Sequence, residues 1–110
     1  MTIKARSKLV EDIYTPKSEE KEKNPTTFKL KALTSFQYLD VLGDMDGDLF
    51  TAKALEKISE YSFVSANNLL DMDGKKIERL NADYLPPLLI IELANRVISI
   101  STISEEEKKI

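Results

Sequence analysis

The predicted fold depends most on residues 85–103, LPPLLIIELANRVISISTI. The prolines Pro86 and Pro87 are tolerated in the first turn of a helix, because backbone N–H groups there have no intrahelical partner. The residues that follow are mostly apolar, so their stripe is wider than a helix on a protein surface needs. We therefore expect a helix over residues 88–101 that lies either at the centre of the core or partly in an interface.

These two locations lead to different predictions for the same helix, and the sequence leaves both open. If the helix contacts another protein or a second copy of this chain, its apolar stripe supplies the contact. If it is the core helix, the same side chains are enclosed within one molecule. The residues that we expect at a partner contact are Leu89, Ile90, Leu93, Val97 and Ile100.

Glu92 is the one acidic residue within this apolar helix, and it precedes Arg96 by four residues. That spacing places the two side chains on one helix face, where they would form an ion pair. A carboxylate used for acid–base chemistry needs burial or a close neighbour that shifts its pKa. We therefore interpret Glu92 as structural. Beyond the helix, residues 104–107 form a capping box, which predicts a short terminal helix.

A β-hairpin is expected over residues 67–77, upstream of the apolar helix. Asp73 and Gly74 would supply the two positive-φ positions of a tight turn, with Leu70 or Met72 before it and Ile77 after it. Strands this short are marginally stable unless they pack on helices.

Two helices are expected before the hairpin. Thr34 and Gln37 form a capping box, and the helix that follows should end near Gly43. A second helix should cover residues 49–62, with Asp48 as its N-cap. The side chains expected to face inward are Phe36, Leu39 and Leu42 in the first helix and Leu49, Ala52, Ala54, Leu55 and Ile58 in the second.

The N-terminal quarter of the chain is predicted to contain a strand and an arm. Residues 26–33 alternate between apolar and polar, which indicates a strand with one wet face. Its Phe28 should lie in the core, as should Phe63. Residues 8–14 have apolar side chains at helical spacing, which predicts a short helix. Residues 15–25 contain no apolar residue, so they cannot bury enough surface to offset the entropy of ordering.

Together these segments predict a mainly α fold, α+β at most. Residues 26–110 would form a single small helical domain with one N-terminal strand and a short β-hairpin. Residues 1–25 would form a flexible N-terminal arm.

Composition excludes several classes of protein. The chain has 110 residues, which is one small domain at most. Its net charge of −3, from 16 basic and 19 acidic residues, is too balanced for electrostatic binding to nucleic acid. The longest apolar run, residues 88–91, is far too short to cross a membrane, and no apolar run follows the first residues as in a secretory signal. We expect an intracellular protein with no nucleic-acid or membrane partner.

Residues for catalysis or metal binding are also scarce. The chain has no cysteine and no histidine, which excludes thiolate zinc sites, thiol nucleophiles and an imidazole base for serine. Asp44, Asp46 and Asp48 suggest a calcium loop, but that loop needs glycine where Leu49 stands and glutamate where Leu55 stands. The 3 glycines are not clustered, so no phosphate loop is expected. We predict no catalytic residue, no metal and no cofactor, and hence a protein that is not an enzyme.

The order of four stretches resembles the small tail assembly chaperones of long-tailed phages and prophages. Residues 28–34 resemble the opening strand and cap of that family, and residues 63–77 resemble its central turn segment. Residues 85–87 resemble the start of its last helix, and residues 103–109 its end. One departure is plain: relatives often have a tryptophan before the Asn-Leu pair, where this chain has Ala66 or Asn67.

The resemblance implies a function. Such chaperones bind the tape measure protein in the host cytoplasm, help tail tube subunits polymerise around it, and are absent from the finished virion. A longer form often arises by ribosomal frameshifting. Two alternatives stay open: a structural tail or neck component that is retained in the virion, and a small phage-encoded regulatory protein. Self-association into a homo-oligomer also stays open.

Overall fold

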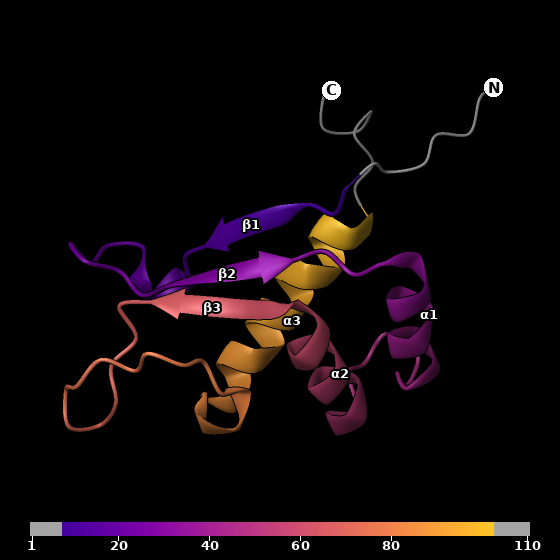
Figure 1. Ribbon diagram of the computed structural model, residues 1–110. Coiled ribbons are helices and arrows are strands. Elements are labelled where there is room, and N and C mark those ends of the chain that lie inside the picture. The colour runs from indigo at the N-terminus through magenta and orange to yellow at the C-terminus, as the bar shows by residue number, and fades with distance from the viewer. Residues whose placement is uncertain (1–7, 103–110) are drawn as a thin grey trace.

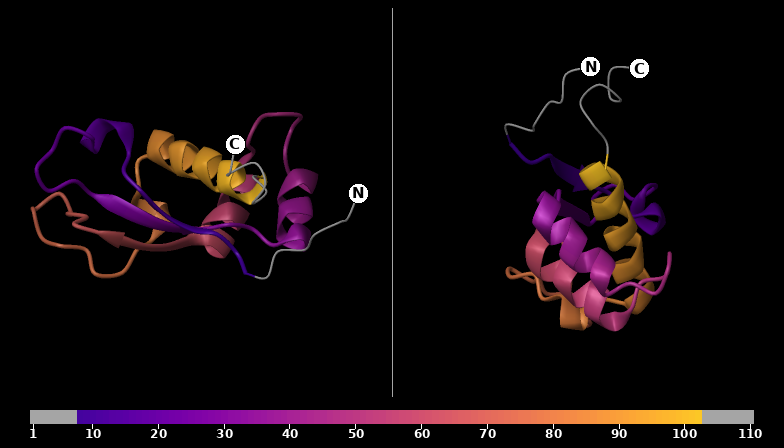
Figure 2. Two further views of the ribbon diagram at one scale, coloured as in Figure 1. Left: turned by 90° about the horizontal axis from the view of Figure 1, so that it is seen from above. Right: turned by 90° about the vertical axis from the view of Figure 1, so that its right-hand side faces the viewer.

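The computed structural model describes residues 8–102, which fold into a sheet with helices on one of its faces (Figures 1 and 2). The sheet has 3 antiparallel strands in the order β1-β2-β3. Two short 3-10 helices, η1 (Lys17–Glu19) and η2 (Ala82–Tyr84), lie in the connections. The strands are β1 (Glu11–Tyr14), β2 (Thr27–Lys31) and β3 (Phe63–Asn67), and the helices are α1 (Ser35–Gly43), α2 (Ala52–Ser62) and α3 (Pro87–Thr102).

The prediction of a mainly α protein is wrong, because the three-stranded sheet makes this a small α+β domain. Residues 8–14, expected to be a short helix, contain strand β1 instead. β1 lies within the expected N-terminal arm, yet it pairs with β2 along its whole length, from Glu11 opposite Lys31 to Tyr14 opposite Phe28. Local spacing favoured a helix there, but pairing with a distant strand decided the outcome.

Strand β2 is at the centre of the sheet, and its alternation was predicted correctly. Phe28 and Leu30 are fully buried, whereas Thr27, Lys29 and Lys31 are partly exposed. β3 was not predicted. It follows α2 directly and pairs with the other edge of β2, from Thr27 opposite Asn67 to Leu30 opposite Phe63. Its five residues follow an apolar helix without a break, so periodicity gave no sign that the helix had ended.

Helix α1 begins as predicted but faces the other way. The backbone N–H of Gln37 donates to the hydroxyl of Thr34 at 3.1 Å, and that of Thr34 donates to the side-chain oxygen of Gln37 at 3.0 Å. The capping box is therefore confirmed, as is the end of the helix at Gly43. The predicted inward face is wrong: Val41 is buried, while Phe36, Leu39 and Leu42 are exposed.

Helix α2 begins three residues later than predicted. Its N-cap is Thr51, whose hydroxyl accepts from the backbone N–H of Ala54 at 3.1 Å. Asp48 and the exposed Leu49 belong instead to a tight turn, in which Asp46 and Leu49 exchange backbone hydrogen bonds of 3.0 and 2.9 Å. In α2 itself the expected inward positions Ala54 and Ile58 are fully buried, and Leu55 packs against the core.

The hairpin predicted over residues 67–77 is reduced to a loop with one isolated bridge, between Leu70 and Lys76. The turn lies where it was expected, but of its two central residues only Gly74 has a positive φ, of 81°. A side chain takes the place of some backbone hydrogen bonds between the two expected strands: the carboxylate of Asp71 accepts from the backbone N–H groups of Asp73 and Lys75 at 2.8 and 2.9 Å. Such an Asx turn competes with strand pairing.

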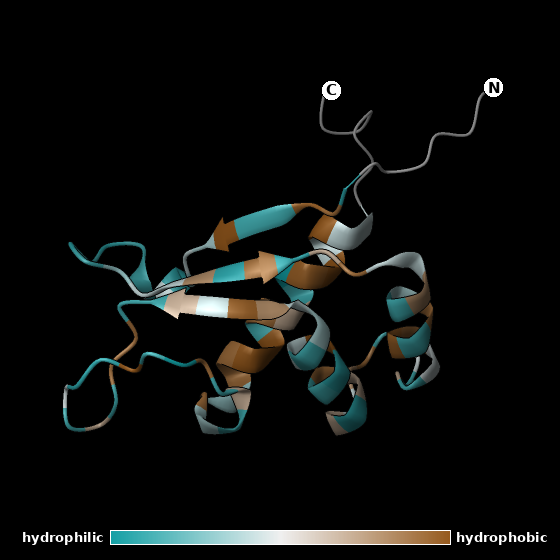
Figure 3. Ribbon diagram, viewed as in Figure 1, coloured by the Kyte–Doolittle hydropathy of each residue, from teal (hydrophilic) through white to brown (hydrophobic). Residues whose placement is uncertain are grey.

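Helix α3 covers one face of the sheet and is largely apolar along its length (Figures 2 and 3). The prediction of a helix here is confirmed. Its buried side chains meet those of β2 and α2 in a single core that includes Phe28, while Phe63 is only partly buried and packs against this core. Among residues 8–102, no helix combines the length and apolar character needed to cross a membrane. The terminal helix predicted from residue 104 lies outside the described residues.

Candidate functional site

The five predicted contact residues divide between the core and the surface. Leu93 and Val97 are fully buried, and Ile100 is nearly so. They lie from the middle of α3 onward and form no exposed surface in this structure. Leu89 and Ile90, in the first half, are only partly buried and pack at the margin of the core. The start of α3 is therefore the part of this helix that a partner can reach.

Other apolar side chains gather around the start of α3. Leu88 is 80% exposed and Ile91 is 36% exposed. Large apolar side chains of the 69–77 loop and of η2 are exposed as well. Isolated exposed apolar residues are common on proteins, but several of these line shared hollows, Leu70, Met72, Tyr84 and Leu89 in one and Ile90 and Ile91 in another, which indicates a contact surface. We call this group the α3 apolar surface, and it consists of Leu70, Met72, Tyr84, Leu88, Leu89, Ile90 and Ile91.

Two hollows border this surface, one on each side of the segment that leads into α3. A loop-side hollow of about 510 Å³ lies between the 69–77 loop and the start of α3, where Met72 and Leu89 line it. A helix-side hollow of about 290 Å³ lies between α2 and α3, where Leu55 and Ile90 line it. Leu85 lines both hollows. Of the two partly buried predicted residues, Leu89 thus lines the loop-side hollow and Ile90 lines the helix-side hollow.

The prolines explain why the chain can place apolar groups at this point. Pro86 and Pro87 have no backbone N–H, so the first turn of α3 leaves fewer donors unsatisfied. The carbonyl of Pro86 accepts from the N–H groups of Leu89 and Ile90 at 3.0 and 3.1 Å. Leu85, just before them, is buried and anchors the entry to the helix. The exposed Leu88 therefore sits on a fixed helical turn.

The polar side of α3 is fixed to the N-terminal strand. Glu92 accepts from the hydroxyl of Tyr14 at 2.6 Å and from the backbone N–H of Lys17 at 3.0 Å. Arg96 donates to the carboxylate of Asp12 at 2.7 Å and lies 5.8 Å from the centre of the Tyr14 ring. Glu92 and Arg96 thus find partners in β1 and η1, in place of the ion pair that the sequence suggested. The interpretation of Glu92 as structural agrees with this contact.

The titration of Tyr14 is shifted by that contact. Burial raises the pKa of Tyr14 to about 12, and the hydrogen bond to Glu92 and the negative charge of Glu92 act in the same direction. A phenol held protonated in this way serves as a hydrogen-bond donor to the carboxylate. It has a structural role in joining β1 to α3.

Of the three aspartates that suggested a calcium loop, Asp44 contacts cationic side chains. Lys57 contacts the carboxylates of Asp40 and Asp44 at 2.8 and 2.5 Å, and these hydrogen bonds raise the pKa of Lys57. The pKa of Asp40 is lowered by hydrogen bonds from Lys57 and Tyr61. Within the described part of the chain, no three acidic side chains are grouped so that they could hold a metal ion.

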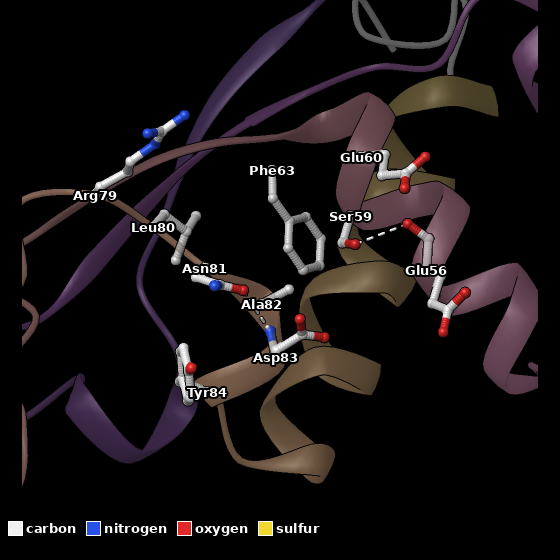
Figure 4. Close-up of a pocket in the computed structure, with 10 residues that line it drawn as sticks. All are labelled: Glu56, Ser59, Glu60, Phe63, Arg79, Leu80, Asn81, Ala82, Asp83 and Tyr84. Carbon is white, nitrogen blue, oxygen red and sulfur yellow. Dashed lines mark hydrogen bonds between the residues drawn. The ribbon is translucent and has the colours of Figure 1, made fainter.

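A third hollow, of about 810 Å³, lies between the end of α2, the start of β3 and the segment 79–84 (Figure 4). The ring of Phe63 points into it. Glu56 and Glu60 line it from α2 and Asp83 lines it from η2, while Arg79 lies at the opposite end. We call this hollow the acidic cleft. Its residues come from two segments far apart in the chain, 56–63 and 79–84, so sequence reasoning did not find it.

Sequence reasoning also missed Leu88, Ile91 and Tyr84 as surface residues. The signal that could have found Leu88 and Ile91 was the width of the apolar stripe, because one face of a helix cannot bury side chains that lie all around it.

Comparison with known proteins found no relative of this chain: no protein-family model, no curated protein and no solved structure matches it.

Proposed function

We propose that this protein is a phage tail assembly chaperone, which binds the tape measure protein in the host cytoplasm and assists assembly of the tail tube without catalysing a reaction. The single observation that carries the proposal is the α3 apolar surface. It lies at the start of α3, directly after residues 85–87, which form one of the four stretches of resemblance to that family. A tape measure protein is a long, apolar, helix-rich chain that needs its apolar stripes covered before assembly.

The surface has the chemistry for that contact. Burying one large apolar side chain contributes about 1.5–3 kcal/mol, while association costs several kcal/mol in lost freedom. Several side chains must therefore act together, as the seven of the α3 apolar surface can. An amphipathic helix docks by placing side chains at regular intervals into hollows. The loop-side and helix-side hollows, on either side of Leu85, offer such positions.

Co-purification tests the proposal. The full chain is produced together with the tape measure protein of the same phage genome, and the complex is recovered through a tag on the tape measure protein. The double variant Leu88→Ser, Ile91→Ser removes two exposed apolar side chains of the surface, so it should reduce the amount recovered by about tenfold or more. The matched control is Phe36→Ser, which removes an equally exposed apolar side chain from α1.

Two results would contradict the proposal. Equal loss of binding in the Phe36→Ser control would place the contact elsewhere. Mass spectrometry of purified virions that finds this protein in many copies would show a structural component, because a chaperone leaves before the particle is complete. Light scattering of the purified protein determines whether the same surface joins two copies of the chain instead.

A further inference from the structure

We propose that the acidic cleft binds an extended peptide segment that carries a lysine or arginine between apolar residues, and that this segment adds a strand to the free edge of β3. The cleft shares Tyr84 with the α3 apolar surface, but the free edge of β3 and the acidic residues of the cleft are not part of that surface. The proposal therefore stands whether or not the protein is a tail assembly chaperone. Three features carry it: the free edge of β3, the charge around the cleft, and the apolar side chains within it.

The edge of β3 is open to pairing. β3 is the last strand of the sheet, and no other strand among residues 8–102 pairs with its outer side. The backbone N–H of Ala32 donates to Val10 at 2.7 Å, so alternate residues of β2, including Phe28, direct their backbone groups toward β1. Phe28 lies opposite Ala66. Ala66 therefore directs its backbone groups away from β2, toward the free edge, whereas the register shift between Lys29 and Leu30 interrupts the alternation at Val64.

The cleft continues from that edge. β3 begins at Phe63, whose ring points into the cleft, and β3 runs along one side while residues 79–82 run along the other (Figure 4). A strand added at Ala66 and running along β3 would therefore reach the cleft at its Phe63 end. Its alternate side chains would contact Phe63 and Leu80, which supply the apolar part of the cleft. Main-chain hydrogen bonds and alternating side-chain contacts are the usual means of strand addition.

Charge determines which segment fits. Glu56, Glu60 and Asp83 line the cleft, and none of them forms an ion pair within residues 8–102. Arg79, the only basic residue of the lining, lies at the far end. The lining thus has an excess of acidic over basic side chains, and a cationic side chain in the peptide would offset that excess.

The same charge argues against a second copy of this chain as the occupant. A second copy joined edge to edge through its own β3 would place residues 63–67, FVSAN, beside the cleft. That strand has no cationic side chain to pair with the acidic residues of the cleft. A basic segment of a different protein supplies one.

The test uses full-length protein labelled with nitrogen-15 and a defined probe: a capped seven-residue peptide of alternating valine and lysine. Titration by NMR should shift the amide signals of Val64, Ala66 and the cleft residues. A matched peptide with glutamate in place of lysine should produce no shift there. A third peptide, N-methylated at alternate residues so that it cannot donate to a strand edge, should bind at least tenfold more weakly.

Two variants of the protein complete the test. Glu60→Gln removes one carboxylate of the cleft and should weaken binding of the valine–lysine peptide by up to about fivefold. Glu22→Gln, which removes an exposed carboxylate far from the cleft, should leave binding unchanged. Equal binding of the glutamate peptide, equal binding of the N-methylated peptide, or shifts confined to the α3 apolar surface would each overturn the proposal. So would the absence of any shift at a millimolar concentration of the probe.

Discussion

Helices α1 and α3 both carry a stripe of large apolar side chains, but the stripe of α3 is mostly buried and the stripe of α1 is exposed. In α3 the side chains at the centre of the helix, such as Leu93 and Val97, are fully buried between the sheet and α2. In α1 the predicted stripe of Phe36, Leu39 and Leu42 faces outward, and Phe36 is 85% exposed. The periodicity of a sequence shows that a stripe exists, but not which element covers it.

The difference has a structural cause. α3 lies across the sheet and contacts β1, β2 and α2. α1 lies beyond the end of the sheet and packs beside α2 (Figure 1). It buries only Val41 fully, and Tyr38 packs against the core from the same helix. The capping box at Thr34 holds the start of α1 in place, so a local hydrogen bond contributes relatively more to α1 than packing does.

The largest effect is expected at the centre of α3. Leu93→Ala removes a fully buried side chain and should lower the free energy of unfolding by about 2–5 kcal/mol, through lost burial and the cavity left behind. Urea denaturation measures the change. Asn95→Ala, on the exposed side of the same helix, is the control and should change it by no more than about 0.5 kcal/mol. Similar values for the two variants would mean that α3 is not the core helix.

The next effect concerns the contact that holds α3 to β1. Tyr14→Phe removes the hydrogen bond to Glu92 and should cost about 1.5 kcal/mol near neutral pH. Because the pKa of Tyr14 is raised to about 12 in the folded protein, from an ordinary value of about 10, the folded state retains this proton longer than the unfolded state. The stabilisation is complete below pH 10 and is lost as the pH rises through about 12.

Urea denaturation at a series of alkaline pH values tests the second part of this prediction. The wild-type protein should lose stability between about pH 10 and about pH 12, and Tyr14→Phe should lose less over the same range. Tyr84→Phe is the matched control, because Tyr84 is an exposed phenol in η2. An identical pH dependence in wild type and Tyr14→Phe would show that the contact with Glu92 does not stabilise the fold.

A smaller effect is expected at the start of α1. Thr34→Ala removes both the acceptor for the N–H of Gln37 and one half of the capping box, and it should cost about 1 kcal/mol. Thr34→Ser keeps the hydroxyl and should retain most of that stability. Thermal unfolding followed by circular dichroism compares the two. Equal melting temperatures for Thr34→Ala and Thr34→Ser would contradict the importance of the cap for α1.

The smallest effect is expected on the exposed face of α1. Phe36→Ser should change the free energy of unfolding by about 0.5 kcal/mol or less, because the ring of Phe36 gains little from folding. The measurement is the same urea denaturation as for Leu93→Ala. A loss comparable with that of Leu93→Ala would remove the contrast between the two helices and show that α1 packs its stripe inward.

The sequence alone was sufficient where the signal is local or strongly periodic. The alternation of β2, the cap of α1 at Thr34 and the helix after Pro87 were predicted because each depends on neighbouring residues. Strands β1 and β3 were missed because short strands depend on a partner far along the chain. In the candidate site, Leu89 and Ile90 were predicted as contact residues and do border the two hollows.

What the amino-acid sequence by itself determined is where α1 and α3 begin, which strand alternates, and that the last described helix is unusually apolar. These properties follow from hydrogen bonds and side-chain periodicity within a few residues. Only the tertiary structure decided that β1 and β3 flank β2, that the stripe of α1 faces solvent, and that Glu56, Phe63 and Asp83 border one cleft. The physical reason is that strand pairing and burial join residues far apart in the chain, and the free energy of those contacts outweighs local preference.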